Sequence, residues 1–202
     1  MTSAQPFPAA RVLGEGDPDE RLVERCLEGD REAFATLVRR YQRPIFHAAY
    51  RVLGREEDAS DVTQAVFLKM VEKLPDFDPR YRFFSWIYRI AINEALNVLR
   101  RNGRDEPLDE DHEPEGPESA SPEWQATEAE TSRRIQRALM RMKPSDRAVI
   151  TLRHFSDCSY EEIAHALDID VKTVKSRLFE ARARMRGLLE ELRPAPGAEV
   201  AS

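Results

Sequence analysis

Apolar residues recur every three or four positions along most of this 202-residue chain, which is the spacing of an amphipathic helix. The first apolar stripe follows Asp30, which we expect to cap the helix. It contains Pro44, an expected kink or break, and ends at Gly54. Its apolar members are Phe34, Leu37, Val38, Tyr41, Ala48 and Val52. The pattern predicts a helix, and no useful length of the sequence alternates as a strand does.

Two further helices are predicted in the first half of the chain. One is expected to be capped by Ser60 and stopped by Pro75, with apolar residues Val62, Val66, Phe67, Met70, Val71 and Leu74. The other runs from about Phe84 to Arg101. Its predicted core arc is Phe84, Ile87, Tyr88, Ala91, Ile92, Ala95, Val98 and Leu99. Together these helices predict a small bundle.

The second half of the chain also has a helical pattern. Ile135, Leu139 and Met142 mark a helix closed by Pro144, and Ser145 is expected to cap the next one. The segment Ser159–Glu162 has the pattern of a capping box and opens a short helix. A turn at 168–170 then leads into a final helix from about Val171 to Leu189.

Charge is segregated along the chain. Residues 105–130 carry 11 acidic residues and no Lys or Arg, whereas 1–104 and 131–202 have net charges of +1 and +4. The overall net charge of −6 and the pI near 5.4 therefore reflect one acidic stretch. They do not exclude nucleic acid as a partner of the flanking segments.

These patterns predict an all-α protein with two small helical domains joined by an acidic flexible linker. We expect the domains at 19–104 and 127–192, the linker at 105–126, and disordered tails at 1–18 and 193–202.

Several classes of protein are excluded. No apolar run approaches the roughly 18–20 residues of a membrane helix, and the first residues lack the pattern of a secretory signal. Cys26 and Cys158 are expected to be reduced thiols in the cytoplasm. His154, Cys158 and His165 do not have the spacing of a zinc site, and no catalytic motif is present. We expect neither an enzyme nor a bound cofactor or metal.

The predicted helix from Phe84 to Arg101 has an unusual polar face. That face carries Trp86, Arg89, Asn93, Asn97, Arg100 and Arg101, and the preceding loop adds Arg80, Tyr81, Arg82 and Phe83. Arginines bind phosphates, amides hydrogen-bond to base edges, and aromatic rings stack on unpaired bases. The face is suited to holding separated DNA strands. Composition alone supports equally well an ordinary solvated helix face with one half-buried Trp.

The segment of about 160–182 is a candidate helix-turn-helix. Its second helix has a narrow apolar seam made of Val171, Val174, Leu178, Ala181 and Met185. The remaining surface carries Lys172, Thr173, Lys175, Ser176, Arg177, Phe179, Glu180 and Arg182. Such a helix can enter a major groove and contact base edges. The alternative is a solvated amphipathic helix in a bundle.

Three motifs resemble those of extracytoplasmic-function (ECF) sigma factors. The segment Glu57–Phe67 is similar to the polymerase-binding helix of that family, and Phe83–Asn93 resembles its −10 melting and recognition helix. Tyr160–Ala164, followed by Val171–Arg182, resembles its −35 helix-turn-helix. The motifs occur in the family's order and together cover most of the chain.

The resemblance implies a role for each matching residue. Asp61, Gln64 and Phe67 would bind core RNA polymerase. Arg80, Phe83, Trp86, Arg89, Asn93, Asn97 and Arg100 would contact −10 DNA. Lys172, Thr173, Lys175, Ser176, Arg177 and Phe179 would contact −35 DNA. Glu180 departs from the Arg often found in relatives, and its carboxylate can accept a hydrogen bond from a cytosine amine.

The function implied is promoter-specific initiation of transcription. The implied partners are core RNA polymerase, through its beta and beta-prime subunits, promoter DNA and an anti-sigma factor, with no membrane insertion of the chain itself. The alternatives are a helix-turn-helix DNA-binding regulator that is not an initiation factor, and a protein-interaction module. The acidic linker has three possible roles: a spacer, a nucleic-acid mimic in the polymerase cleft, and a cover for the basic faces.

Overall fold

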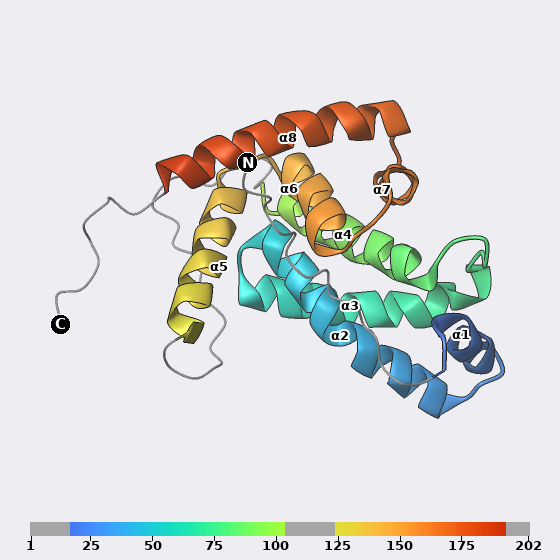
Figure 1. Ribbon diagram of the computed structural model, residues 1–202. Coiled ribbons are helices and arrows are strands. Elements are labelled where there is room, and N and C mark those ends of the chain that lie inside the picture. The colour runs from blue at the N-terminus through green and yellow to red at the C-terminus, as the bar shows by residue number, and fades with distance from the viewer. Residues whose placement is uncertain (1–16, 104–123, 193–202) are drawn as a thin grey trace.

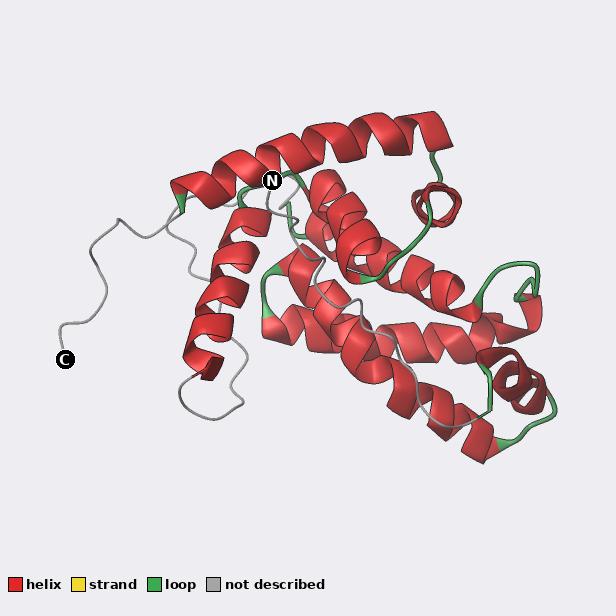
Figure 2. Ribbon diagram, in the orientation of Figure 1, coloured by secondary structure: helices red, strands yellow, loops and turns green. Residues whose placement is uncertain are grey.

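The computed structural model describes residues 17–103 and 124–192, and every regular element in these two ranges is helical (Figure 1; Figure 2). The all-α prediction is confirmed for this part of the chain. The predicted linker and tails lie almost wholly outside the described residues. Within the described ranges, no helix combines the length and apolar character needed to cross a bilayer.

The first unit is built from four α-helices and one short 3-10 turn. These are α1 (Asp19–Leu27), α2 (Arg31–Leu53), α3 (Glu56–Lys73), η1 (Leu74–Asp76) and α4 (Phe83–Arg101). Helices α2, α3 and α4 pack against one another around a core that includes Leu37, Ile45, Val66, Met70, Ile87 and Ile92. Burial of this shared apolar face is the main force that holds the bundle together.

Helix α2 begins and ends where the sequence predicts. The Asp30 carboxylate accepts hydrogen bonds from the backbone N–H groups of Glu32 (2.8 Å) and Ala33 (3.1 Å). Gly54 follows the last residue in the left-handed conformation, with φ +78°. Of the kink or break expected at Pro44, the break does not occur, because α2 runs continuously from Arg31 to Leu53 with the proline inside it.

Three further details differ from the prediction. Ser60 lies inside α3, whose N-cap is Arg55, and Ser145 lies inside α6, whose N-cap is Lys143. Neither serine caps its helix, because each helix starts before it: α3 with an acidic first turn, and α6 with Pro144, a residue suited to the first turn. Val71 does not join the core stripe, since it is 57% exposed.

The second unit carries the helix-turn-helix. It consists of α5 (Trp124–Met140), α6 (Pro144–Ile150), a π-helical turn (Thr151–Phe155), α7 (Tyr160–Leu167) and α8 (Val171–Glu191). The capping box is present: the Glu162 N–H donates to the Ser159 hydroxyl, and the Ser159 N–H donates to the Glu162 carboxylate. Asp170 caps α8 by accepting from the N–H of Thr173 at 2.8 Å.

The two units pack directly against each other. Helix α7 lies on α4, and α5, α6 and the π-helical turn contact α2. The fully buried Arg147 of α6 donates to the carbonyl oxygens of Val52 (2.7 Å) and Met142 (3.1 Å). Gln136 of α5 donates to the Tyr50 carbonyl oxygen at 2.9 Å. The sequence pattern did not predict this contact between units.

Candidate polymerase and nucleic-acid interfaces

Helix α3 carries an exposed stripe along one side. Asp61, Gln64, Leu68 and Val71 recur at helical spacing and are all exposed, Leu68 at 68% and Val71 at 57%. The opposite side of the helix, which includes Val62, Val66 and Met70, is buried in the bundle. The stripe therefore combines an acid, an amide and two large apolar side chains, which is suitable chemistry for docking a protein.

The structure places the three predicted α3 residues in different environments. Asp61 and Gln64 lie on the exposed stripe, whereas Phe67 is half-buried and packs against the core. Leu68 was missed. Its place on the same face as Asp61 and Gln64 follows from the helical repeat, but an apolar residue was not expected to point outward.

Helix α4 presents the polar face expected from its sequence. Trp86, Arg89, Asn93 and Asn97 are half-buried, and Arg100 is exposed near the end of the helix. Their positions follow one side of α4 at intervals of three or four residues. A cationic, amide and aromatic surface thus runs along the helix, as a nucleic-acid path requires.

An aromatic cluster fixes the start of this face. The ring of Trp86 lies 5.4 Å from that of Phe77 and 5.5 Å from that of Phe83. Phe83 also packs edge-on to Tyr41 at 5.4 Å. Phe83 is only 1% exposed, so the structure does not present it to DNA as the sequence prediction had it. Its geometry is that of a core residue that supports Trp86 and the 77–82 loop.

The loop before α4 carries an exposed arginine. The guanidinium of Arg80 binds the Asp78 carboxylate at 2.5–3.0 Å, and this pairing holds the pKa of Asp78 below its ordinary value. Arg80 is exposed and Asp78 is half-buried, so the pair is screened by solvent and contributes little to stability. Arg80 is therefore accessible, and a DNA phosphate can replace the Asp78 carboxylate as its partner.

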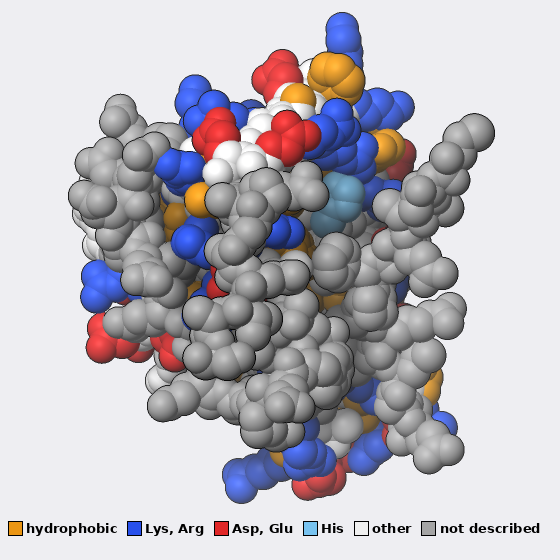
Figure 3. All heavy atoms as spheres, turned by 60° about the vertical axis from the view of Figure 1, so that its left-hand side comes forward, with side chains coloured by type: hydrophobic (Ala, Val, Ile, Leu, Met, Phe, Trp, Pro, Cys, Tyr) orange, Lys and Arg blue, Asp and Glu red, His pale blue; other side chains and the backbone are white. Residues whose placement is uncertain are grey.

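Helix α8 has the most open of the three faces. Lys172, Lys175, Ser176 and Phe179 share one exposed side, and Phe179 is 76% exposed. In Figure 3, Lys and Arg side chains gather along the upper part of the molecule, where α8 lies, with some acidic side chains among them. A basic helix with an exposed aromatic ring can bind phosphates and contact a thymine methyl group.

Four of the predicted α8 residues have structural partners. The Ser176 hydroxyl donates to the Thr173 carbonyl oxygen at 3.2 Å, and the Lys175 ammonium lies 5.9 Å from the centre of the Tyr160 ring. The Thr173 hydroxyl donates to Asp170 at 2.7 Å, so this side chain helps to start the helix. Arg177 is half-buried near Asp146 of α6. Burial raises the pKa of the Asp146 carboxyl, and Arg177 opposes that shift.

The three residues considered for metal binding have other neighbours. His154 accepts a hydrogen bond from Arg182 at 3.0 Å, His165 lies 2.7 Å from a guanidinium nitrogen of Arg89, and Cys158 is buried. Burial raises the pKa of the Cys158 thiol to about 12. Within 17–103 and 124–192 no three His, Cys, Asp or Glu side chains are grouped for a metal ion.

Sequence reasoning missed the residues by which the helix-turn-helix contacts α4. Ser85, Arg82 and Arg89 of the first unit face Glu162 and His165 of α7. Glu162 was predicted only as part of the capping box, and His165 only as an unconvincing metal ligand. Periodicity within one helix carries no signal for such contacts.

Two family models match the chain. Residues 37–105 match sigma-70 region 2, and residues 132–185 match sigma-70 region 4. The first range covers α3, α4 and most of α2, and the second covers the helix-turn-helix. The faces described above therefore lie within the matched regions.

Full-length relatives agree with these matches. The RNA polymerase sigma-H factor of Pseudomonas aeruginosa is 35% identical over 186 residues, which are 87% of this chain and 96% of the relative. The ECF RNA polymerase sigma-E factor of Haemophilus influenzae is 34% identical over 190 residues, 89% of this chain and 100% of the relative. A solved structure of CnrH in complex with the cytosolic domain of CnrY superposes with a TM-score of 0.65 at 27% identity, covering 87% of this chain and 99% of that one. This chain belongs to the ECF family of RNA polymerase sigma factors.

Proposed function

We propose that this chain binds core RNA polymerase and directs it to promoters, and that the polymerase performs all the chemistry. The observation that carries the proposal is the pairing of two matched regions with three distinct faces in one chain. Helix α3 offers a protein-docking stripe, α4 a strand-holding face, and α8 a groove-binding face. We place this action in the cytoplasm, where core polymerase meets the chromosome.

The α3 stripe is the proposed contact with polymerase. Asp61 and Gln64 supply directional polar contacts, and Leu68 and Val71 supply apolar area that is otherwise exposed to water. Phe67 supports the stripe from its half-buried position. The partner surface is expected on the beta-prime subunit, with further contacts to beta.

The α4 face is the proposed contact with −10 DNA. Trp86 would stack on an unpaired base, Asn93 and Asn97 would hydrogen-bond to base edges, and Arg80, Arg89 and Arg100 would bind phosphates. Extrusion of a base from the stack requires a few kcal/mol, which such contacts offset. Phe83 is assigned the supporting role that its burial favours.

The α8 face is the proposed contact with −35 DNA. Lys172 and Lys175 would bind phosphates or guanine edges, Ser176 would donate to a base, and Phe179 would contact a thymine methyl group. Thr173 and Arg177 flank this face, where they would fix the register of the helix on the phosphate backbone. Glu180 is also exposed and would favour cytosine at its position.

A plain helix-turn-helix regulator explains less. It accounts for α7 and α8 but gives no use to the α3 stripe or the α4 face. The relatives align over almost their whole length, including both regions, which favours an initiation factor. An anti-sigma protein is the further partner we propose, because the solved structure of CnrH is of a complex with the cytosolic domain of a second protein, CnrY.

Titration of labelled core polymerase with the purified chain tests the proposed docking helix. We expect the double variant Asp61→Ala, Gln64→Ala to bind core polymerase at least several-fold more weakly, because each loses a polar contact at the centre of the stripe. The matched control is Gln42→Ala with Glu190→Ala, an exposed amide and an exposed acid on α2 and α8. Equal affinity of the α3 variant and the wild type would contradict this docking surface.

A further inference from the structure

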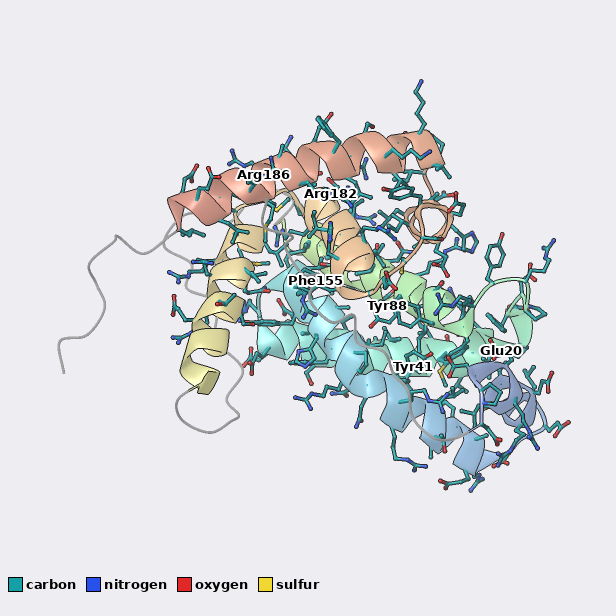
Figure 4. The ribbon with its side chains drawn as sticks, in the orientation of Figure 1. Glu20, Tyr41, Tyr88, Phe155, Arg182 and Arg186 are labelled. Carbon is teal, nitrogen blue, oxygen red and sulfur yellow. The ribbon has the colours of Figure 1, made fainter. Side chains whose placement is uncertain are left out.

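Helices α3 and α4 lie side by side (Figure 4), and Glu94 of α4 joins them at the edge of the proposed −10 face. One oxygen of Glu94, Oε1, accepts a hydrogen bond from the Lys69 ammonium of α3 at 2.5 Å. The same oxygen accepts from the side-chain amide nitrogen of Asn97 at 3.4 Å. Glu94 therefore connects the helix proposed to bind polymerase with a residue proposed to contact DNA.

The surroundings of Glu94 hold its carboxylate in place. Its side chain is 15% exposed, whereas that of Lys69 is 37% exposed, so Glu94 is the more enclosed member of the pair. A carboxylate that has lost most of its water needs hydrogen-bond donors close by. Lys69 supplies one donor across the helix boundary, and Asn97 supplies another from three residues further along α4.

The direction of the Asn97 amide follows from the chemistry of this partner. A side-chain amide has a carbonyl oxygen that accepts and an NH2 group that donates. A carboxylate beside an ammonium has no hydrogen to donate, so it engages only the NH2 group of Asn97. The Asn97 Oδ1, on the other branch of the amide, is then the acceptor that Asn97 offers to a ligand.

An amide oxygen in this position favours particular bases. On the edge of a base that faces the major groove in a duplex, adenine N6 and cytosine N4 donate hydrogen bonds. At the equivalent places thymine O4 and guanine O6 accept. A base taken out of the stack exposes such an edge to the protein. The Asn97 Oδ1 therefore matches adenine or cytosine, and would set two acceptors against each other with thymine or guanine.

The asparagine alone does not fix this preference. The terminal torsion of an asparagine side chain is broad and roughly two-fold, so an amide without a fixed partner can turn over and offer either atom. The acceptor at position 94 removes that freedom. The discrimination between bases is thus a property of Glu94 and Asn97 together.

We infer that Glu94 is a positioning residue for promoter recognition, which turns the Asn97 amide so that Asn97 selects adenine or cytosine over thymine or guanine in the −10 strand. The inference rests on the proposed contact of α4 with −10 DNA. Glu94 acts through Asn97, and Lys69 holds Glu94 from the side of α3.

Exchange of the two charges tests this role. The double variant Lys69→Glu, Glu94→Lys retains an ion pair between α3 and α4 and leaves the net charge unchanged. The group that faces Asn97 becomes an ammonium, which can only donate, so the amide must turn and present its NH2 group to the base. The preference should move from adenine and cytosine to thymine and guanine. A purely structural role of the ion pair would not reverse it.

Glu94→Gln is the second variant, and it keeps the shape of the side chain. A glutamine amide can offer Asn97 either a donor or an acceptor, so the preference should flatten rather than reverse. The matched control is Glu32→Arg with Arg39→Glu, which reverses an ion pair of 2.6 Å between exposed residues of α2. Neither control residue is assigned to polymerase or DNA.

Base preference is measured by transcription with the full chain and core polymerase. A start site that the wild type uses is chosen, its −10 segment is randomised, and each template carries a barcode in the transcribed region. Sequencing of the transcripts then counts initiation from every −10 sequence. At one position we expect the wild type to favour adenine or cytosine by about 2- to 10-fold, the net contribution of one hydrogen bond. The double variant should reverse this ratio, and Glu94→Gln should bring it close to one.

The outcomes separate this inference from the proposed function. If the wild type starts transcripts but the folded variants keep its base ratios at every −10 position, the role of Glu94 is overturned while the proposed function stands. A wild type that starts no transcripts contradicts the proposed function and the inference with it. The same change of ratio in the α2 control would also overturn the role of Glu94. Circular dichroism checks the fold of each variant, and Glu94→Gln alone decides if the double variant is unfolded.

Discussion

Gly54 is a residue whose conformation and surroundings both exclude a side chain. It ends α2 at φ +78°, a region that L residues with a Cβ rarely adopt. A methyl group at this position would overlap the sulfur of Met140, which is itself 2% exposed. Met140 belongs to α5, so this glycine also permits the close approach of the second unit to the first.

Gly54→Ala is expected to destabilise the protein by about 2 kcal/mol or more, through left-handed strain and overlap with Met140. Urea unfolding followed by circular dichroism measures the change. The control is Gly29→Ala, because Gly29 has φ +90° but no atom near the position of a Cβ. Equal losses in the two variants would show that the Met140 contact contributes nothing.

Helix starts were predicted in part from the sequence. Asp30 and the Ser159–Glu162 capping box lie where helix-start patterns place them, whereas Ser60 and Ser145 do not cap their helices. Side chains whose partners lie in the other unit were not predicted, because nothing in the local sequence pattern distinguishes them. Arg147 is the strongest example: an arginine in a short helix is expected at the surface, yet it is fully buried and binds carbonyl oxygens from both units.

Helix α4 shows how much of a single element the apolar periodicity of the sequence predicts. Its bounds were predicted to within one residue, and its polar stripe from Trp86 to Arg100 lies on one side as expected. Its core was only partly predicted, because Ser85 and Ile90 are also buried. A helical wheel assumes one buried side, whereas α4 is packed by α2 and α3 on one side and by α7 on another.

Trp86→Ala is expected to weaken binding of α4 to single-stranded −10 DNA by roughly 5- to 150-fold, the loss of about 1–3 kcal/mol of base stacking. Binding of duplex −35 DNA through α8 should be unchanged. Trp86→Phe is the matched control, since it keeps an aromatic ring next to Phe77 and Phe83. Anisotropy titrations with each DNA measure both affinities. Parallel losses on the two DNAs would indicate damage to the fold and contradict the stacking role.

The packing of the two units is a property of the whole molecule. The sequence predicts two helical units because each has its own apolar stripes and an acidic segment separates them. It does not predict that they adhere, because that contact depends on side chains distant in sequence, such as Ser85 and Glu162.

The packing of α7 on α4 should depend on pH through His165. Burial, and next the Arg89 charge, lower the pKa of His165 below its ordinary value, and Asp168 and Asp78 oppose the shift. The form in which α7 packs on α4 therefore binds fewer protons than a form in which the two helices separate. The contribution of His165 to this packing is fully present above the ordinary histidine pKa, near 6.5, and is lost as pH falls from there through the lowered pKa.

Scattering measured from about pH 8 to about pH 5 tests this dependence. The radius of gyration should rise at the acidic end for the wild type, and the rise should be smaller in His165→Gln, which cannot titrate there. The comparison with His165→Gln is needed because two other histidines also have lowered pKa values. Burial lowers the pKa of His47, which lies near Arg51 and Arg43, and the pKa of His154, which lies near Arg182 and Arg153. Identical pH profiles would contradict a role for His165.

The most direct test of the central claim is transcription in vitro. Purified chain is added to sigma-free core polymerase with a pool of genomic fragments, and the 5′ ends of the transcripts are sequenced. We predict discrete start sites that share −10 and −35 sequences and are absent without the chain. A preparation that binds both core polymerase and duplex DNA but produces no such start sites would contradict the assignment of this chain as a promoter-directing initiation factor.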